Sequence, residues 1–244
     1  MLIPSLKRAI AQFVKKPFPF VWSSIMYVVL QLLFAFAAVG LFIIYFIIAS
    51  VFGVPVTTGS VLTVLAAMFV LFVLAFFSCG LNAGLFRSYA AALEGRKTTV
   101  ADFLRYSLKK SAPMFAVLLL AGVLLTVLVG PAVLLYTISL KAIAYMNFLV
   151  ALYALGAAFV VFFLFTPAFV AIGAFGTEFV SSLRGMIVFL SRKHVNALGL
   201  YVLFACVWVL NAIPLVQIAS FLVLYPVIAS AFVVMFQGSG GRPR

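Results

Sequence analysis

Long stretches without a single charged side chain constrain this chain more than any other feature of its sequence. Four of them occur, at residues 17–86, 111–140, 142–177 and 195–241. An α-helix crosses the hydrocarbon core of a bilayer with about 20 apolar residues, whereas a soluble domain needs a charged surface. Because 68% of the residues are hydrophobic and only 8% are charged, we predict an integral membrane protein whose solvent is lipid.

The lengths of these stretches predict the number of spans. The first holds 70 residues and is interrupted at 52–59 by Gly, Pro and Thr residues typical of a turn, so it fits two spans. The second and third, of 30 and 36 residues, fit one span each. The fourth is interrupted around Asn211, Pro214 and Gln217 and fits two short spans. We therefore expect an all-α, polytopic fold with six transmembrane helices.

The charged residues predict how these spans are oriented. Sixteen Lys and Arg residues stand against three acids, and they form clusters between the apolar stretches. With both termini in the cytoplasm, 15 of the 16 positive charges lie on the cytoplasmic side and only Lys141 lies outside. Lys and Arg concentrate in cytoplasmic loops. The prediction is a multi-pass protein of the cell membrane with cytoplasmic N- and C-termini, and its charges do not indicate binding to nucleic acid.

The first apolar stretch follows Lys7, Arg8, Lys15 and Lys16, as the apolar part of a signal peptide would. It is about twice too long for that role and has no cleavage pattern of small residues. We expect it to remain as a membrane span. The polar residues 238–244 are predicted to form a disordered tail.

A basic segment of twelve residues occurs three times, at 5–16, 99–110 and 182–193, and each copy ends in two adjacent basic residues. Each has helical periodicity. In the second, Thr99 and Asp102 have the spacing of a capping box, which predicts a helix start. We predict three cytoplasmic amphipathic elbow helices in the headgroup layer. Residues 1–237 would form a single transmembrane domain of three elbow-plus-hairpin units, at about 1–92, 93–176 and 177–237.

Two passages carry a resemblance to a known group of proteins. In residues 81–104 a helix end of small residues leads through Glu94, Gly95 and Arg96 into the second basic segment. The sequence Phe-Thr-Pro-Ala-Phe at 165–169 precedes the third. This pattern resembles prokaryotic six-span membrane proteins, among them the YciC-like proteins and the membrane domain of some glycerophosphodiester phosphodiesterases. The resemblance implies a fold, because the phosphodiesterase chemistry of that group lies in a separate domain that these residues do not include.

The residue types that carry catalysis or bind metals are scarce. His194 stands beside Arg192 and Lys193 without a carboxylate or serine partner, and Glu178 ends the fourth predicted span. The two cysteines lie in apolar stretches without metal-ligand spacing, which predicts buried thiols. No acid lies within a span, where ion-coupled transport would need one. We therefore predict no enzyme activity, no cofactor and no metal site.

Polar and small residues inside the spans predict contacts between helices. Interhelical hydrogen bonds are expected from a set of amides and one hydroxyl: Gln31, Asn82, Thr126, Asn147, Asn196, Asn211 and Gln217. Small residues at Gly80 and Gly84, and again at 154–158, predict close helix approach.

Our leading hypothesis is a non-enzymatic lipid-interacting scaffold, or a membrane subunit of a larger assembly, whose basic segments bind anionic headgroups. The candidate headgroup residues are Lys15, Lys16, Arg87, Arg105, Lys109, Lys110, Arg192 and Lys193. Expected partners are anionic lipids and a membrane protein or a second copy of the chain. One alternative is that these charges only set topology, with Arg87 reaching to the interface. Another is a channel, permease or transporter subunit for a small, lipidic or anionic solute. A lipid-modifying enzyme would need Glu94, Asp102, Glu178 and His194 to converge, and is the least favoured hypothesis.

Overall fold

The computed structural model describes residues 2–51, 61–137, 145–210, 217–218 and 220–239, and this part of the chain contains helices and no strand. The elements are α1 (Leu2–Lys15), α2 (Pro17–Val51), α3 (Val61–Leu93), α4 (Val100–Leu135), α5 (Met146–Phe175), α6 (Phe179–Leu210), the π-helix η2 (Ser220–Leu224) and α8 (Tyr225–Gln237). Six helical segments in the described residues are long and apolar enough to cross a membrane: α2 to α6 and the segment Ser220–Gln237. The predicted all-α membrane fold with six such helices is confirmed. The turns predicted at 52–59 and around Asn211 and Pro214 lie outside the described residues.

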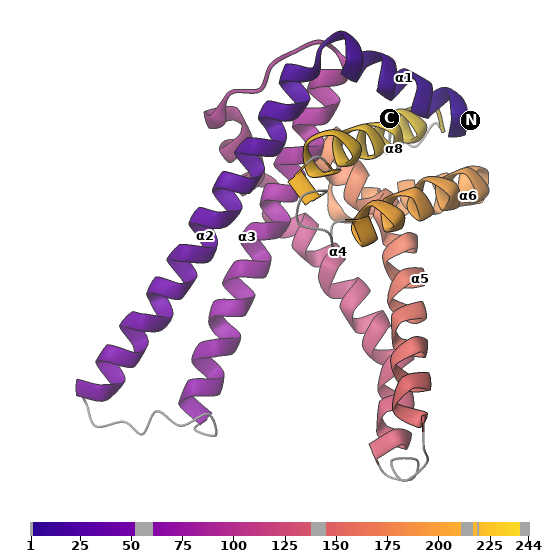
Figure 1. Ribbon diagram of the computed structural model, residues 1–244. Coiled ribbons are helices and arrows are strands. Elements are labelled where there is room, and N and C mark those ends of the chain that lie inside the picture. The colour runs from indigo at the N-terminus through magenta and orange to yellow at the C-terminus, as the bar shows by residue number, and fades with distance from the viewer. Residues whose placement is uncertain (1, 52–60, 138–144, 211–216, 219, 240–244) are drawn as a thin grey trace.

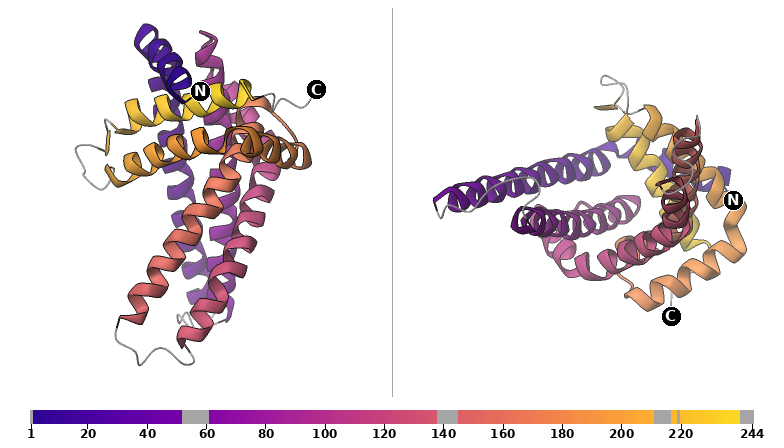
Figure 2. Two further views of the ribbon diagram at one scale, coloured as in Figure 1. Left: turned by 90° about the vertical axis from the view of Figure 1, so that its right-hand side faces the viewer. Right: turned by 90° about the horizontal axis from the view of Figure 1, so that it is seen from below.

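The long helices form two antiparallel hairpins, α2 with α3 and α4 with α5 (Figure 1). They meet at one end of the molecule, drawn at the top, and diverge toward the other. Helices α6 and α8 run across the end where the hairpins meet, roughly perpendicular to them (Figure 2). Helix α1 and both described ends of the chain lie there as well.

The packed core lies where the hairpins meet. Its largest buried side chains are aromatic and come from five helices: Phe20, Tyr89, Phe103, Phe189 and Phe236. Away from this core the hairpins expose large apolar side chains, such as Phe36 on α2 and Leu155 on α5, which are 72% and 69% exposed. Apolar surface on this scale is typical of helices solvated by lipid.

Among the described residues, charge is confined to one end of the fold. Helices α2, α5 and α8 carry no charged residue. The described Lys and Arg residues lie in α1 and at its junction with α2, in the last turns of α3, in the turn after α3, and in the first halves of α4 and α6. These parts all lie where the hairpins meet (Figure 1). The cytoplasmic orientation of this end stays a prediction.

The three basic segments differ in how they join the spans. The first is α1, a separate helix that ends before Pro17, and a residue before proline disfavours helical geometry. The second and third are the opening turns of α4 and α6, which continue into the apolar part without interruption. Thr99 caps α4, and its Oγ1 accepts a hydrogen bond from the Asp102 backbone N–H at 3.1 Å, which confirms the predicted helix start. Location of these segments in the headgroup layer stays a prediction.

Glycines let α3 and α4 cross closely. A Cβ added to Gly80 would lie 2.7 Å from the carbonyl oxygen of Ser107, and one added to Gly84 would overlap the Ser107 hydroxyl. Close approach at this pair is therefore confirmed. Within residues 154–158, Gly156 makes no close contact, because a Cβ added there would meet no atom within 4 Å. That part of α5 has diverged from the neighbouring hairpin.

Two of the predicted interhelical hydrogen bonds are present. Gln31 Nε2 donates to Ser78 Oγ at 2.7 Å and joins α2 to α3. Asn196 Oδ1 accepts from the backbone N–H of Leu2 at 3.2 Å and joins α6 to α1. Asn82 donates to the Ser78 carbonyl oxygen of its own helix, and its side chain also interacts with the side chain of Tyr27 on α2. Thr126 bonds to the Gly122 carbonyl oxygen of its own helix.

A basic pocket between α3 and α4

The last turns of α3 and the first turns of α4 enclose a pocket of about 440 Å³. Its lining holds five cationic side chains and one acid, Asp102; the cations are Arg87, Arg96, Lys97, Arg105 and Lys109. Three of the predicted headgroup residues, Arg87, Arg105 and Lys109, thus meet in one place. Arg96 and Lys97 were not among the predicted site residues, and they join the pocket from the turn between the two helices.

Two matching stripes of residues build the pocket. On α3 the stripe is Gly84, Arg87, Ser88 and Ala91, and on α4 it is Asp102, Arg105, Tyr106 and Lys109. Both have the spacing i, i+3, i+4, i+7, which places four side chains on one helical face. The α3 stripe is small apart from its arginine, so space remains between the helices, and the α4 stripe supplies long cations. This paired spacing is the sequence signal that marks the pocket.

Arg87 is held in place by the end of α5. One guanidinium nitrogen donates to the carbonyl oxygen of Ala174 at 3.1 Å, and the guanidinium lies 5.6 Å from the ring centre of Tyr106. The Tyr106 hydroxyl lies 2.9 Å from the carbonyl oxygens of both Ile172 and Gly173. A cation beside the carbonyl end of a helix is electrostatically favourable. Arginine carries five N–H donors, so this anchor leaves others for a ligand.

The acids near the pocket already have partners. The Asp102 carboxylate accepts a hydrogen bond from the Thr99 hydroxyl at 2.7 Å, so it serves the start of α4. Glu94 forms an exposed ion pair with Arg96. In the described part of the chain neither Arg105 nor Lys109 forms an ion pair. The pocket therefore keeps an excess of uncompensated positive charge.

A buried hydroxyl adds a neutral donor to this lining. Ser88 lines the pocket, is 1% exposed, and its Oγ has no hydrogen-bond partner among the described residues. A buried hydroxyl left without a partner costs roughly 1–3 kcal/mol. An oxygen-rich anion in the pocket would satisfy the hydroxyl and the cations together.

The other predicted headgroup residues lie elsewhere. Lys16 lines a smaller hollow with Lys97, and its Nζ lies 3.2 Å from where a Cβ on Gly95 would be, so the end of α1 adjoins the basic pocket. Lys15 is exposed in the last turn of α1. Arg192 donates to the carbonyl oxygen of Ser239 at 3.3 Å. Neither Arg192 nor its neighbour Lys193 lines the pocket.

Lys110 has a different role from its neighbour Lys109. Its side chain is only 6% exposed, and its Nζ donates to Glu178 Oε1 at 2.7 Å. This hydrogen bond and the lysine charge lower the pKa of the Glu178 carboxyl from its ordinary value. The pair ties α4 to the turn between α5 and α6.

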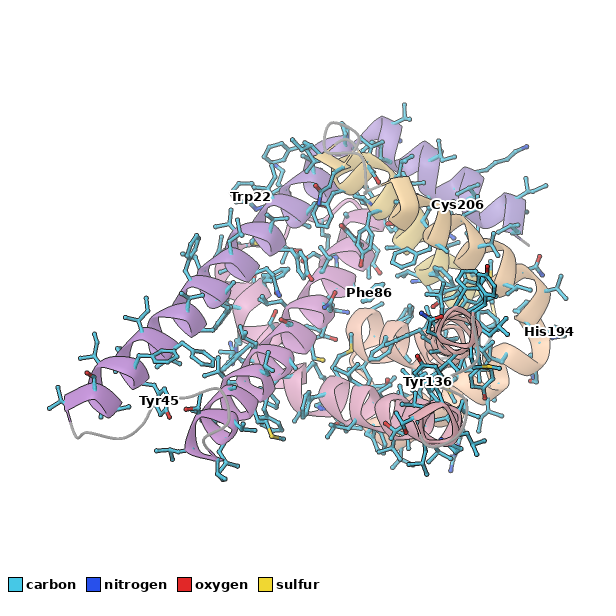
Figure 3. The ribbon with its side chains drawn as sticks, turned by 60° about the horizontal axis from the view of Figure 1, so that its bottom comes forward. Trp22, Tyr45, Phe86, Tyr136, His194 and Cys206 are labelled. Carbon is cyan, nitrogen blue, oxygen red and sulfur yellow. The ribbon has the colours of Figure 1, made fainter. Side chains whose placement is uncertain are left out.

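The residues that a lipid-modifying enzyme would need are not brought together. Glu94, Asp102 and Glu178 bond to Arg96, Thr99 and Lys110 respectively. The Nδ1 atom of His194 lies 3.1 Å from the Leu190 carbonyl oxygen, and the residue sits at the outer side of α6 (Figure 3). Among the described residues, no three His, Cys, Asp or Glu side chains are grouped closely enough to hold a metal ion.

Both cysteines are free thiols, and they differ in burial. Cys79 is buried as predicted, but Cys206 is exposed. The prediction for Cys206 was wrong because an apolar neighbourhood in the sequence does not distinguish a packed helix face from one that lipid can cover.

This fold and pocket define a class of protein: an integral, multi-pass helical membrane protein with a basic pocket at the charged end of its helices. No protein-family model, curated protein or solved structure matches the chain. The resemblance to YciC-like proteins therefore stays a prediction.

Proposed function

We propose that this chain is a non-enzymatic, lipid-interacting membrane protein that binds the phosphate of an anionic lipid headgroup in the pocket between α3 and α4. The observation that carries the proposal is the lining itself, with five cations and one acid whose carboxylate is already hydrogen-bonded. The planar guanidinium of arginine can donate two hydrogen bonds to the oxygens of one phosphate, and the ammonium group of lysine adds positive charge without a fixed hydrogen-bond geometry.

The position of the pocket supports a lipid as the source of this phosphate. Apolar hairpins extend from the end of the fold that holds the pocket, and their exposed side chains require a hydrocarbon surrounding (Figure 1). The pocket then lies at the level of the headgroups. The excess of Lys and Arg supports the cytoplasmic leaflet of the cell membrane as the place of these headgroups. Through such contacts the protein would act as a scaffold or as the membrane subunit of a larger assembly.

Binding of dihexanoyl phosphatidylglycerol to the detergent-solubilised protein tests this function. The double variant Arg105→Gln/Lys109→Gln removes two cations of the lining. Each basic group near anionic lipid contributes about 1 kcal/mol, so two losses weaken binding by about 30-fold. The matched control Arg184→Gln/Lys193→Gln removes the same charge from α6, outside the pocket, and is expected to bind nearly as the wild type does.

Three outcomes would contradict the proposal. Equal losses in the two double variants would assign the effect to overall charge. Binding of dihexanoyl phosphatidylcholine as tight as that of phosphatidylglycerol would remove the selectivity for anions. Inorganic phosphate binding as tightly as the lipid would assign the pocket to a free anion.

A second candidate function, passage of a solute, has one observation in its favour. A separate cavity lies among α3, α4, α5, α6 and α8, and none of the described residues that line it is charged. This lining favours a lipidic solute over an anionic one. Release of a fluorescent neutral lipid from reconstituted vesicles, compared with release of an anionic dye, would test the permease hypothesis.

A further inference from the structure

The uncharged cavity lies where the two hairpins begin to diverge. It has a volume of about 370 Å³, within the range of small-molecule sites. Helix α3 lines it from one hairpin and α4 and α5 from the other, while α6 and α8, which cross the hairpins, contribute the remaining side chains. Phe86, one of the lining residues, lies in the space between the hairpins when the molecule is seen from below (Figure 3). The cavity is partly open.

Hydrocarbon suits the greater part of this lining. Seven of the fifteen lining residues are aromatic, and Met114, Leu118 and two alanines add further apolar surface. A charged group would lose its hydration here without gaining a partner of opposite charge. The occupant is therefore neutral and largely apolar.

Two tyrosine hydroxyls in the cavity lack a hydrogen-bond acceptor among the described residues. Tyr201 on α6 and Tyr225 on α8 both line it, and neither hydroxyl forms a hydrogen bond with another described residue. Tyr201 is 9% exposed. Hydroxyl groups away from water need an acceptor, because leaving them without one costs free energy. An occupant with an uncharged oxygen supplies that acceptor.

We propose that this cavity binds a neutral lipid, a hydrocarbon chain that carries a hydroxyl or carbonyl oxygen, which enters from the bilayer between the hairpins. The apolar walls hold the chain, and the hydroxyls of Tyr201 and Tyr225 donate to the oxygen. This site shares none of its lining residues with the basic pocket, so the two proposals stand or fall separately.

The two cysteines provide the measurement. Cys79 lines the cavity, whereas Cys206 is exposed on α6 and lines neither pocket (Figure 3). The protein in phosphatidylcholine nanodiscs is treated with N-ethylmaleimide, and modification at each cysteine is followed by mass spectrometry. Dodecanol is expected to slow the reaction of Cys79 at least fivefold and to leave Cys206 unchanged. Dodecanoate, which carries a charge, is expected to protect neither cysteine.

Two variants separate cavity binding from a general effect on the membrane. Ala75→Phe fills the cavity, so the rate at which N-ethylmaleimide modifies Cys79 should no longer depend on the dodecanol concentration. Ala37→Phe, on an exposed face of α2, should keep this dependence. Tyr201→Phe keeps the ring and loses the donor. A hydrogen bond contributes about 0.5–1.5 kcal/mol net, so the dodecanol concentration that half-protects Cys79 should rise about 2- to 10-fold in this variant. The dodecane concentration that half-protects Cys79 should stay the same, because dodecane accepts no hydrogen bond.

The proposal is overturned if dodecanol leaves Cys79 unprotected or protects both cysteines equally. It is also overturned if Tyr201→Phe weakens protection by dodecane as much as protection by dodecanol. This last comparison stays decisive even if Ala75→Phe fails to fold.

Discussion

Lys110 is a single side chain that ties α4 to the turn between α5 and α6. Its ammonium group is buried beneath the turn between α5 and α6, where Glu178 Oε1 lies at 2.7 Å and the carbonyl oxygen of Thr177 at 3.5 Å. Most of the Glu178 side chain is exposed. The carboxylate therefore neutralises a buried charge from the surface, where protons can reach it. Neutralisation of this acid leaves a buried ammonium with one long hydrogen bond.

Glu178→Gln is expected to lower the midpoint of thermal unfolding at neutral pH by a few degrees, because it removes this charge. The folded state lowers the pKa of Glu178 below its ordinary 4.5, mainly through the hydrogen bond from Lys110. Stabilisation by such a group is present above the ordinary pKa and is lost as the pH falls through the lowered value. The difference in unfolding midpoint between wild type and variant should thus shrink below about pH 4.5. Thermal unfolding scans in detergent, from neutral pH to below pH 4.5, measure this difference.

Glu94→Gln is the matched control for that experiment. Glu94 also forms an ion pair, but both partners are largely exposed, and such pairs contribute little. The unfolding midpoint of the Glu94→Gln variant should stay near that of the wild type at every pH. A difference between wild type and Glu178→Gln that does not change with pH would contradict the role given to the carboxylate.

The crossing of α3 and α4 shows how an element-scale contact determines the site. Gly84 packs on Ser107 at the crossing, and the same glycine begins the small stripe on α3 that leaves room for the basic pocket. Close packing of small residues is the main source of helix association in lipid, since burial of apolar surface contributes little there. The site and the stability of the hairpin contact therefore share one residue.

Gly84→Leu is expected to force α3 and α4 apart and to destabilise the protein by about 1–3 kcal/mol or more, the usual cost of overpacking. It should also weaken binding of phosphatidylglycerol, because the pocket loses its shape. The control is Gly156→Leu, at a helix position where an added Cβ meets nothing within 4 Å. Thermal unfolding and lipid binding of the two variants give the comparison. Equal destabilisation by both would show that loss of glycine, and not the crossing, is responsible.

Sequence patterns predicted the features of this fold that depend on neighbours along one helix. The charge-free lengths predicted six apolar helices, Thr99 with Asp102 predicted the start of α4, and Gly80 with Gly84 predicted a close contact. Each follows from local periodicity or hydration. No pocket between helices was predicted, but Arg105 and Lys109, two of the residues that line it, were placed on one helical face that a sequence displays directly.

Features that depend on tertiary packing escaped prediction. Hydropathy treats all six apolar helices alike and does not give the direction of α6 and α8, which cross the hairpins (Figure 2). The hydrogen bond from Arg87 to the Ala174 carbonyl oxygen of α5 joins residues far apart in sequence. Lys109 and Lys110 are neighbours with opposite roles, because successive residues of a helix point in different directions. Their separation depends on what packs on each side.

At the scale of the whole molecule, charge and hydrophobicity divide the fold along its length. The basic elements, the turn between α3 and α4, and the turn between α5 and α6 gather at one end, and the far ends of the hairpins carry apolar side chains (Figure 1). Charged groups resist transfer into hydrocarbon, so the charged end lies outside the hydrocarbon core of the bilayer. The bias of Lys and Arg predicts that this end faces the cytoplasm.

Cysteine labelling tests this orientation in full. On a background with Cys79→Ala and Cys206→Ala, single cysteines are placed by Thr98→Cys, Ser181→Cys and Val61→Cys. The first two lie at the turns of the charged end, and Val61 begins α3 at the opposite end, where it is 74% exposed. A membrane-impermeant maleimide should label the first two only in inside-out vesicles and the third only in right-side-out vesicles. The reason is that the helices which join the charged end to the opposite end cross the hydrocarbon core of the bilayer. Labelling of the two turns from outside would reverse the orientation and remove the cytoplasmic leaflet from the proposed function. Labelling of all three from one side would mean that α3 does not cross the membrane, and the basic pocket would then have to be placed anew relative to the headgroups.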